Sequence, residues 1–258
     1  MEYRNLIVEK DGPLALVTVN RPEVRNALDT ATWRELARLI DEFEGEAQVR
    51  VVIITGAGDK AFVAGADVRS LRERSMYETF RGEGQRTLSR WEAMESVTIA
   101  AINGFALGAG CELALACDLR IASDNAVFGQ PELNLAILPG AGGTQRLTRL
   151  VGPGKAKEMI FTGELLKAQE ALAAGLVNKV VRTEELLNSA REMAGKILAK
   201  GPLAVKFAKA VINAGANADL QTGLVIERMA QAVLFTTEDR LEGMDAFLGK
   251  RPPRYSGK

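Results

Sequence analysis

Two glutamates lie in stretches of apolar residues and glycine, which is an unusual setting for a charged side chain. Glu112 follows the bend Gly108-Ala109-Gly110 and belongs to an otherwise apolar run that ends at Cys117. Glu132 lies twenty residues further on, between the apolar residues of the segment 128–133. Burying a carboxylate costs several kcal/mol unless the group is paired or hydrogen-bonded. Each position therefore requires a structural or a chemical reason.

Glycine bends close to both glutamates supply a second kind of functional group. Backbone amides at a bend that opens a helix point outward and stabilise an oxyanion, and the loop Pro139–Thr144 is a further bend of this type. Two carboxyls near one cavity raise each other's pKa and divide acid and base duty. Taken singly, Glu112 is explained as a helix-capping residue and Glu132 as a surface residue. In their shared context, the pair predicts an active site for proton transfer.

The absence of histidine narrows the chemistry further. It excludes Ser-His-Asp triads, Cys-His dyads and histidine-based metal sites, so proton transfer falls to Glu, Asp, Lys, Tyr or Cys. The sequence contains no nucleophile elbow and no P-loop, and the spacing of Gly104, Gly108 and Gly110 does not match a dinucleotide-binding motif. Cys111 and Cys117 are six residues apart on one expected helix, which is too far for a disulfide and favours a packing role.

The composition indicates a globular protein without a charge bias. The 258 residues are 47% hydrophobic and 26% charged. Because 33 basic side chains balance 33 acidic ones, the net charge gives no sign of a nucleic-acid or membrane partner. No apolar run approaches the roughly 18 residues of a membrane-spanning helix, and Met1–Asn5 lacks the core of a signal peptide. We therefore expect a soluble, cytoplasmic protein.

The two glutamates require elements of an α/β fold to position them. The apolar run 97–102 contains β-branched residues and ends at Asn103-Gly104, which predicts a buried strand followed by a turn. Residues 111–117 predict a compact apolar helix that carries Glu112 in its first turn. The dipole of that helix favours a carboxylate there.

Turn and capping signals divide the first part of the chain into further elements. They predict a hairpin within 6–19, a helix capped by Asp29, a strand at 49–55 and a helix at 68–74 capped by Asp67. The helix after Asp29 has apolar residues at helical spacing, which indicates a face directed at the core. These residues are Trp33, Leu36, Ala37, Ile40 and Phe43.

The character of the chain changes after residue 182. Strands alternate with helices up to a strand predicted at 177–181, and only helices are predicted beyond it. Thr183 is expected to cap the first of these helices, and Pro202 is expected to begin the next. We therefore divide the chain into an α/β core at 1–182, which holds the active site, and a helical region at 183–258.

The segments around the glutamates are similar to the signatures of a known family. Residues 99–113 (Ile-Ala-Ala-Ile-Asn-Gly-Phe-Ala-Leu-Gly-Ala-Gly-Cys-Glu-Leu), Phe128–Glu132 and Pro139–Arg146 resemble signature segments of the enoyl-CoA hydratase (crotonase) family. The similarity extends back through 61–67 to 20–28 and, more weakly, forward to Gly243-Met244 and Lys250. It implies a crotonase-like spiral of ββα units. It also implies that region 183–258 packs against neighbouring subunits, as trimers paired into a hexamer.

The resemblance to this family implies a reaction and roles for five residues. The reaction is the reversible syn addition of water to the 2,3 double bond of a 2-enoyl-CoA thioester, giving 3-hydroxyacyl-CoA. Glu112 would activate the water, and Glu132 would deliver a proton to C2. The backbone amides of Ala66 and Ala109 would hold the thioester oxygen, and the Gly140 amide would help to position the water. Both directions and all acyl-chain lengths are compatible with this assignment.

The resemblance also implies a coenzyme A site, which here is part of the substrate. Arg25 and Lys250 match positions at which the family places cations near the phosphates of coenzyme A. The adenine would meet backbone carbonyls near Ala64 and Ala66. Gln231 stands where some members present an aromatic residue to the adenine, so that wall of the site differs here. We expect no separate cofactor and no metal.

Three alternatives are weighed against hydration. A 3,2-enoyl-CoA isomerase would need chiefly the carboxylate at Glu132, and the presence of Glu112 argues against it. An RNA-binding member of the family uses a lysine-rich helix, whereas the matching segment Thr30–Glu44 has no lysine and a net acidic composition. A structural subunit with an inactive site is disfavoured because both glutamates and both glycine bends are present.

Overall fold

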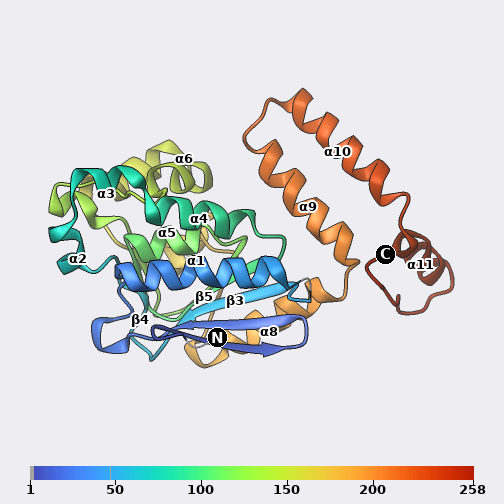
Figure 1. Cartoon of the computed structure of the whole chain (residues 1–258), viewed down its shortest axis with the longest axis horizontal. Coiled ribbons are helices and arrows are strands. Elements are labelled where there is room, and N and C mark those ends of the chain that lie inside the picture. Colours follow the sequence, from blue (N-terminus) through green and yellow to red (C-terminus); the bar gives the residue numbers. More distant parts are fainter. Residues whose placement is uncertain (1–2, 47) are drawn as a thin grey trace.

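The protein, described by a computed structural model over residues 3–46 and 48–258, is built on a six-stranded sheet (Figure 1). Its first two strands form the expected antiparallel hairpin, and all other neighbours in the sheet are parallel. In spatial order the strands are β1 (Leu6–Asp11), β2 (Leu14–Val19), β3 (Val51–Gly56), β5 (Val97–Ile102), β7 (Leu119–Ser123) and β10 (Lys179–Val181). All residues of β3 and β5 are buried, as expected of parallel strands covered on both faces.

The strands of a second, four-stranded sheet alternate along the chain with those of the first. Its strands in spatial order are β4 (Ala61–Val63), β6 (Phe105–Leu107), β8 (Val127–Gly129) and β9 (Leu166–Lys167). After β3, β5 and β7 the chain crosses to this sheet and adds β4, β6 and β8, respectively, as parallel neighbours. This repeated crossing is the spiral that the family resemblance implied, and the expected α/β fold class is confirmed.

Helices cover both sheets and continue beyond them. The helices that accompany the sheets are α1 (Thr30–Gly45), α2 (Val68–Glu73), α3 (Met76–Arg81), α4 (Glu83–Ala93), α5 (Ala109–Leu115), α6 (Gly143–Thr162), α7 (Ala168–Ala173) and α8 (Leu186–Leu198). Three more follow: α9 (Pro202–Gly215), α10 (Leu220–Leu234) and α11 (Glu238–Leu248). Short 3-10 turns lie at η1 (Pro22–Val24), η2 (Pro131–Leu135) and η3 (Thr183–Glu185). None of the described helices is both long and apolar enough to cross a membrane.

The predicted caps of α1 and α2 are confirmed. The Asp29 carboxylate accepts a hydrogen bond from the Thr32 amide at 2.8 Å, and Asp67 accepts one from the Arg69 amide at 3.0 Å. The apolar stripe of α1 is buried apart from Ala37, which is half-buried. Cys111 and Cys117 are buried free thiols, in agreement with a packing role.

The two faces of the six-stranded sheet serve two separate cores. On one face Val52, Ile54, Ala100 and Ile102 join the large cluster that includes α1 and α5. On the other face the alternate strand residues, such as Ile53 and Ile99, pack against α8. This alternation follows from the two-residue repeat of a strand. It leaves α5, all seven residues of which are buried, inside the large core between the sheets.

The expected cap of α8 is wrong. Thr183 begins the 3-10 turn η3, and its hydroxyl donates to the Asp124 carboxylate at 3.0 Å. Helix α8 therefore starts three residues later, at Leu186. Because α8 packs on the sheet, region 183–258 begins with a helix of the core. The predicted start of α9 at Pro202 is confirmed, and the chain leaves the core there.

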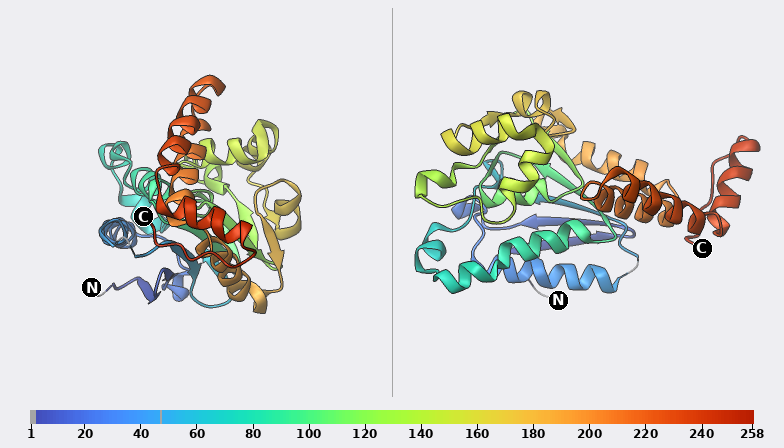
Figure 2. Two further views of the ribbon diagram at one scale, coloured as in Figure 1. Left: turned by 90° about the vertical axis from the view of Figure 1, so that its right-hand side faces the viewer. Right: turned by 90° about the horizontal axis from the view of Figure 1, so that it is seen from above.

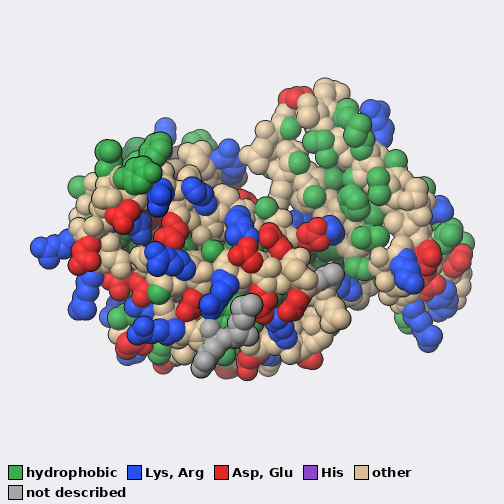
Figure 3. Space-filling view, viewed as in Figure 1, with side chains coloured by type: hydrophobic (Ala, Val, Ile, Leu, Met, Phe, Trp, Pro, Cys, Tyr) green, Lys and Arg blue, Asp and Glu red, His purple; other side chains and the backbone are tan. Residues whose placement is uncertain are grey.

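Helices α9, α10 and α11 form an arm that extends away from the sheets (Figure 2). Its root is fixed by Lys209, whose Nζ lies 2.8 Å from an Asp118 carboxylate oxygen and donates to the Ser96 carbonyl at 2.8 Å. No residue of α9 or α10 is buried. Large apolar side chains are instead exposed along the arm, as the space-filling view shows (Figure 3). They include Ile212, Leu220, Met229, Phe247 and Leu248.

Close contact between α5 and the second sheet depends on glycine at position 110. A Cβ atom added there would lie 1.9 Å from the Val63 carbonyl oxygen, well inside the contact distance. The backbone at the end of β4 thus lies directly against the first turn of α5. This contact brings together the two glycine bends in which Ala66 and Ala109 lie.

We predict that Gly110→Ala lowers the free energy of unfolding by about 2–3 kcal/mol, because the backbone of β4 or α5 must shift to admit the methyl group. Gly195→Ala in α8 is the matched control, since its added Cβ meets no atom within 4 Å. That change should be neutral or stabilise the fold by up to about 1 kcal/mol. Urea unfolding of both variants checks the prediction, and equal midpoints for the two would contradict it.

Candidate active site

Glu112 lies in the first turn of α5 with only 2% of its surface exposed. Its Oε1 atom accepts two hydrogen bonds, from the amides of Ala141 and Gly143, each at 2.7 Å. Burial raises the pKa of this carboxyl, while the two amides and the charge of Arg146 act to lower it. No hydrogen bond to Oε2 occurs within the described residues, so this oxygen is available to a small ligand such as water.

The loop that holds Glu112 is itself fixed from α6. Arg146 donates from Nη1 to the Ala141 carbonyl at 3.0 Å, and its Nη2 lies 2.8 Å from a Glu92 carboxylate oxygen. Gly143 fits because it lacks a side chain: an added Cβ would lie 3.0 Å from Oε1 of Glu112. Gly140, the predicted water-positioning residue, is exposed in the same loop, next to Ala141. Within the described part of the chain, its amide donates to no protein acceptor.

Glu132 is brought to the glycine bend that opens α5. It lies on η2, and an added Cβ on Gly108 would be 2.8 Å from its Oε1 atom. Gly108 has φ 50° and ψ −121°, a backbone conformation that favours glycine. Glycine at position 108 therefore serves both the bend and the close approach of the carboxyl. The structure thus places the Glu132 carboxyl against Gly108, the residue before Ala109.

Glu132 has a different environment from Glu112. The buried Gln130 side chain, with its amide nitrogen toward Glu132, donates to both carboxyl oxygens at 3.2 Å. Burial, followed by the negative charge of Glu112, raises the pKa of Glu132 to about 7. Each carboxyl was expected to raise the pKa of the other. Only Glu132 is affected in this way, because burial alone accounts for the raised pKa of Glu112. At neutral pH, Glu132 therefore still holds a proton in a large fraction of molecules.

Two backbone amides near the carboxyls are free to bind an anion. Leu28 pairs with the neighbours of Ala66, donating to the Gly65 carbonyl and accepting from the Asp67 amide, both at 2.9 Å. The amide of Ala66 consequently points away from Leu28. Ala109 is the first residue of α5, where helix amides have no partner in the helix. Among the described residues, neither amide donates to a protein acceptor.

The predicted coenzyme A residues fall into two groups. Arg25 is exposed, and its carbonyl accepts from the Ala64 amide at 3.0 Å, so Arg25, Ala64 and Ala66 lie close together. Lys250 is exposed just after α11, and within one chain α11 lies at the opposite end of the long axis from α2 and β4 (Figure 1). A single chain therefore does not bring Lys250 to the other three.

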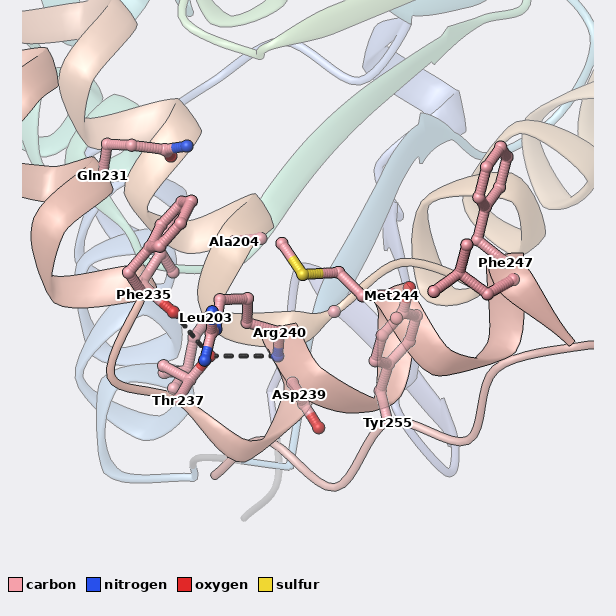
Figure 4. A pocket seen from close by; sticks show the side chains of 14 residues that line it. Leu203, Ala204, Gln231, Phe235, Thr237, Asp239, Arg240, Met244, Phe247 and Tyr255 are labelled. Carbon is pink, nitrogen blue, oxygen red and sulfur yellow. Dashed lines mark hydrogen bonds between the residues drawn. The ribbon is translucent and has the colours of Figure 1, made fainter.

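Gln231 belongs to a cavity within the arm rather than to the carboxyl site. The cavity has a volume of about 610 Å³ and lies among α9, α10 and α11. Figure 4 shows Gln231 at its edge, above the ring of Phe235, with Met244, Phe247 and Tyr255 further along the wall. Within residues 3–46 and 48–258, no group of three or more Cys, Asp or Glu side chains is arranged to hold a metal ion.

Four functional contacts were not predicted from the sequence. They are the amides of Ala141 and Gly143 on Glu112, the amide of Gln130 on Glu132, and the side chain of Arg146 on the loop. The glycine-rich loop signalled an anion site, but the anion it binds in the free protein is the carboxylate of Glu112. The sequence neighbours of Glu112 are uncharged, and this could have indicated that backbone groups form its hydrogen bonds.

Proteins of one known family are similar to this chain over nearly its full length. The model of the enoyl-CoA hydratase/isomerase family matches residues 9–258. The chain is 51% identical to the short-chain-enoyl-CoA hydratase of Clostridium acetobutylicum, with 97% of each chain covered. It is 49% identical to the crotonyl-CoA hydratase of Syntrophomonas wolfei over the full length of both. The crystal structure of an enoyl-CoA hydratase from Bacillus anthracis superposes with a TM-score of 0.95, at 44% identity, covering 99% of this chain and 100% of that one.

The raised pKa of Glu132 predicts a pH-dependent loss of stability that Glu132→Gln removes. Below pH 4.5 the carboxyl is protonated in both the folded and the unfolded chain, so it makes no difference. Between pH 4.5 and about 7 the unfolded chain releases the proton more readily, so the folded state is progressively disfavoured. The free energy of unfolding of Glu132→Gln, relative to the parent, should therefore rise through this window. The expected rise is about 1–2 kcal/mol after allowance for solvent screening.

Urea unfolding of both proteins at a series of pH values measures this difference. The difference should level off above about pH 7, where Glu132 is ionised in both states. A difference that does not change with pH would show that the Glu132 carboxyl titrates normally in the folded protein.

Proposed function

The chain belongs to the enoyl-CoA hydratase/isomerase family, and from this we propose how its site acts. The protein is an enoyl-CoA hydratase, a hydro-lyase that adds water reversibly to the 2,3 double bond of 2-enoyl-CoA thioesters and forms 3-hydroxyacyl-CoA. One observation carries the mechanism. A buried glutamate, Glu112, and a half-buried one, Glu132, lie at one glycine bend, and only Glu112 accepts hydrogen bonds from the amides of Ala141 and Gly143.

Glu112 acts as the general base. Its Oε1 atom is occupied by the Ala141 and Gly143 amides, so Oε2 accepts the proton of the attacking water. The two amides fix the direction of the carboxylate and act against the rise in its pKa that burial causes. General base assistance of this kind accelerates a reaction about 10²–10⁴-fold. The exposed Gly140 amide, next to Ala141, is placed to orient the same water.

Glu132 acts as the general acid. Hydroxide adds to C3, and the electron pair of the double bond moves toward the thioester oxygen, giving an enolate. C2 then takes the proton of Glu132, whose pKa of about 7 suits proton delivery near neutral pH. Exchange with solvent moves the proton gained by Glu112 back to Glu132. Because these transfers need only two carboxyls, no cofactor is required besides the coenzyme A of the substrate.

The amides of Ala66 and Ala109 stabilise the enolate oxygen. Ala66 lies between β4 and α2, and Ala109 is the first residue of α5. Neither amide has a protein acceptor among the described residues. Each such donor contributes about 3 kcal/mol to the transition state by comparison with other oxyanion holes. Both belong to the backbone, so they cannot be removed by ordinary side-chain substitution.

The relatives favour a short acyl chain. Two of them, at 51% and 49% identity, are named for short-chain-enoyl-CoA and crotonyl-CoA. We place the substrate accordingly among short 2-enoyl-CoA thioesters. A role in β-oxidation in the cytoplasm is consistent with this substrate.

Coenzyme A binding and assembly are linked through the arm. Arg25, Ala64 and Ala66 lie together beside the site, whereas Lys250 lies on the arm. The exposed apolar residues of α9–α11 favour contact between copies of the chain, and a hexamer of paired trimers is the assembly we propose. Light scattering of the full chain tests this: the mass of six chains supports it, and the mass of one chain contradicts it.

The division of labour predicts different losses for two substitutions. Glu112→Gln should reduce hydration of crotonyl-CoA about 10²–10⁴-fold, because an amide cannot accept the proton of water. In this variant Glu132 still moves a proton at C2, so deuterium from solvent should still enter C2 of a saturated acyl-CoA. Glu132→Gln should lose both activities. The loss of enoyl-thioester absorbance and mass spectrometry measure the two.

The comparison requires folded variants of matched stability, since removing a buried carboxylate also changes folding. Normal hydration by Glu112→Gln would refute the assignment of the base. Exchange at the parental rate by Glu132→Gln would refute the assignment of the acid. Slow 3,2-isomerisation by Glu112→Gln would agree with the proposal, because that reaction uses the Glu132 carboxyl.

A further inference from the structure

The C-terminal end of α5 meets a buried arginine that the reaction described above does not use. Arg120, on β7, is 6% exposed. Its Nη1 atom donates to the Cys117 carbonyl at 2.5 Å and to the Ala114 carbonyl at 3.4 Å, and its Nε atom donates to the Leu176 carbonyl at 2.8 Å. Two of these three carbonyls belong to the end of α5 or the turn after it.

The charge of Arg120 has no direct counterion among the described residues. No carboxylate there forms an ion pair with it. Asp118, two residues away, is instead paired with Lys209 at 2.8 Å and accepts from the Thr98 amide at 2.7 Å. A buried, unpaired guanidinium is costly, and an apolar residue of similar volume would fill this space at lower cost. The position of the charge therefore calls for a reason.

Helix α5 lies between the charge of Arg120 and the groups proposed to act in the reaction. Its seven residues span about 10 Å, and all of them are buried, so the charge acts through a medium that screens it weakly. The Ala109 amide and Glu112 lie in the first turn, and Arg120 faces the carbonyls at the other end. Arg120 lowers the pKa of Cys111, next to Glu112, although burial has the larger and opposite effect. Its charge thus acts at Cys111, in the first turn of α5.

We propose that Arg120 is a positioning residue for the enolate, a role that rests on the hydratase function proposed above. By offsetting the negative carbonyl end of α5, its charge makes the Ala109 amide at the other end a stronger anion site. The hydrogen bonds to Ala114 and Cys117 also fix the end of α5 against the six-stranded sheet, to which β7 belongs. The proton donor and acceptor remain Glu132 and Glu112.

Acetoacetyl-CoA is the probe for this role. Its C2 proton is acidic, and the enolate that it forms absorbs at longer ultraviolet wavelengths than the keto form. In the bound state the enolate oxygen occupies the place of the thioester oxygen at the Ala66 and Ala109 amides. The ratio of enolate to keto form on the protein therefore measures the strength of the anion site without any turnover.

Two variants of Arg120 separate charge from packing, and a third serves as the control. Arg120→Gln keeps a donor for the carbonyls but removes the charge, whereas Arg120→Lys keeps the charge. Arg182→Gln removes an exposed charge just beyond β10, the strand next to β7. We expect Arg120→Gln to lower the enolate-to-keto ratio about tenfold, as for unit charges about 12 Å apart at an effective dielectric constant of about 20. Arg120→Lys should stay within about twofold of the parent, and Arg182→Gln should equal it.

A folded Arg120→Gln variant with the parental ratio would overturn the inference, since a residue needed only for packing changes stability and leaves this ratio unchanged. If Arg120→Gln does not fold, Arg120→Met decides, because it removes the charge and fills the space with an apolar side chain. A ratio about tenfold below the parent supports the role of the charge, and a parental ratio overturns it. A parent protein that binds acetoacetyl-CoA without forming enolate would instead refute the oxyanion site, and this inference with it. The two failures are therefore distinguishable.

Discussion

The pair of hydrogen bonds from the Ala141 and Gly143 amides to Glu112 is the interaction on which the site depends. Without them, a carboxylate that is 2% exposed would be unpaired in the core, which no small domain tolerates cheaply. The same bonds fix the loop at the start of α6. Arg146 also stabilises that loop by donating a hydrogen bond to the Ala141 carbonyl. They also keep a negative charge beside Glu132, which contributes to the raised pKa of that second carboxyl. Glu112, proposed as the base, the loop and Glu132, proposed as the acid, are thus parts of one electrostatic arrangement.

The fold serves this arrangement by bringing distant segments into contact without side chains between them. Gly108 admits the Glu132 carboxyl, Gly110 admits the β4 backbone, and Gly143 admits Glu112. At each place a methyl group would meet an oxygen atom at or within 3.0 Å. The spiral of paired sheets repeats this close approach, because each turn sends one strand to either sheet. The two carboxyls proposed to act in catalysis are therefore held by close contacts with the backbone.

Local signals in the sequence predicted the elements well, since a strand such as 97–102 or a cap such as Asp29 is decided by a few neighbouring residues. The glutamates were predicted because their apolar surroundings are visible in the sequence. Their partners were not, because Glu112 lies 29 and 31 residues from Ala141 and Gly143, and only the folded chain joins them. Thr183 was misassigned for a related reason: its hydroxyl bonds to Asp124, 59 residues away, instead of to the helix it precedes. The separation of Lys250 from Arg25 depends on the direction of the arm, which no local pattern encodes.

In the proposed mechanism, Glu132 holds a proton near neutral pH while Glu112 is ionised. Infrared difference spectroscopy of the free protein between about pH 5.5 and about pH 8.5 tests this directly, because a protonated carboxyl has a C=O band separate from that of a carboxylate. We expect a protonated-carboxyl band that is lost with a midpoint near pH 7, is absent from Glu132→Gln and persists in Glu112→Gln with a lower midpoint. A spectrum in which no carboxyl titrates above about pH 5.5, or in which the band survives in Glu132→Gln, would contradict the account.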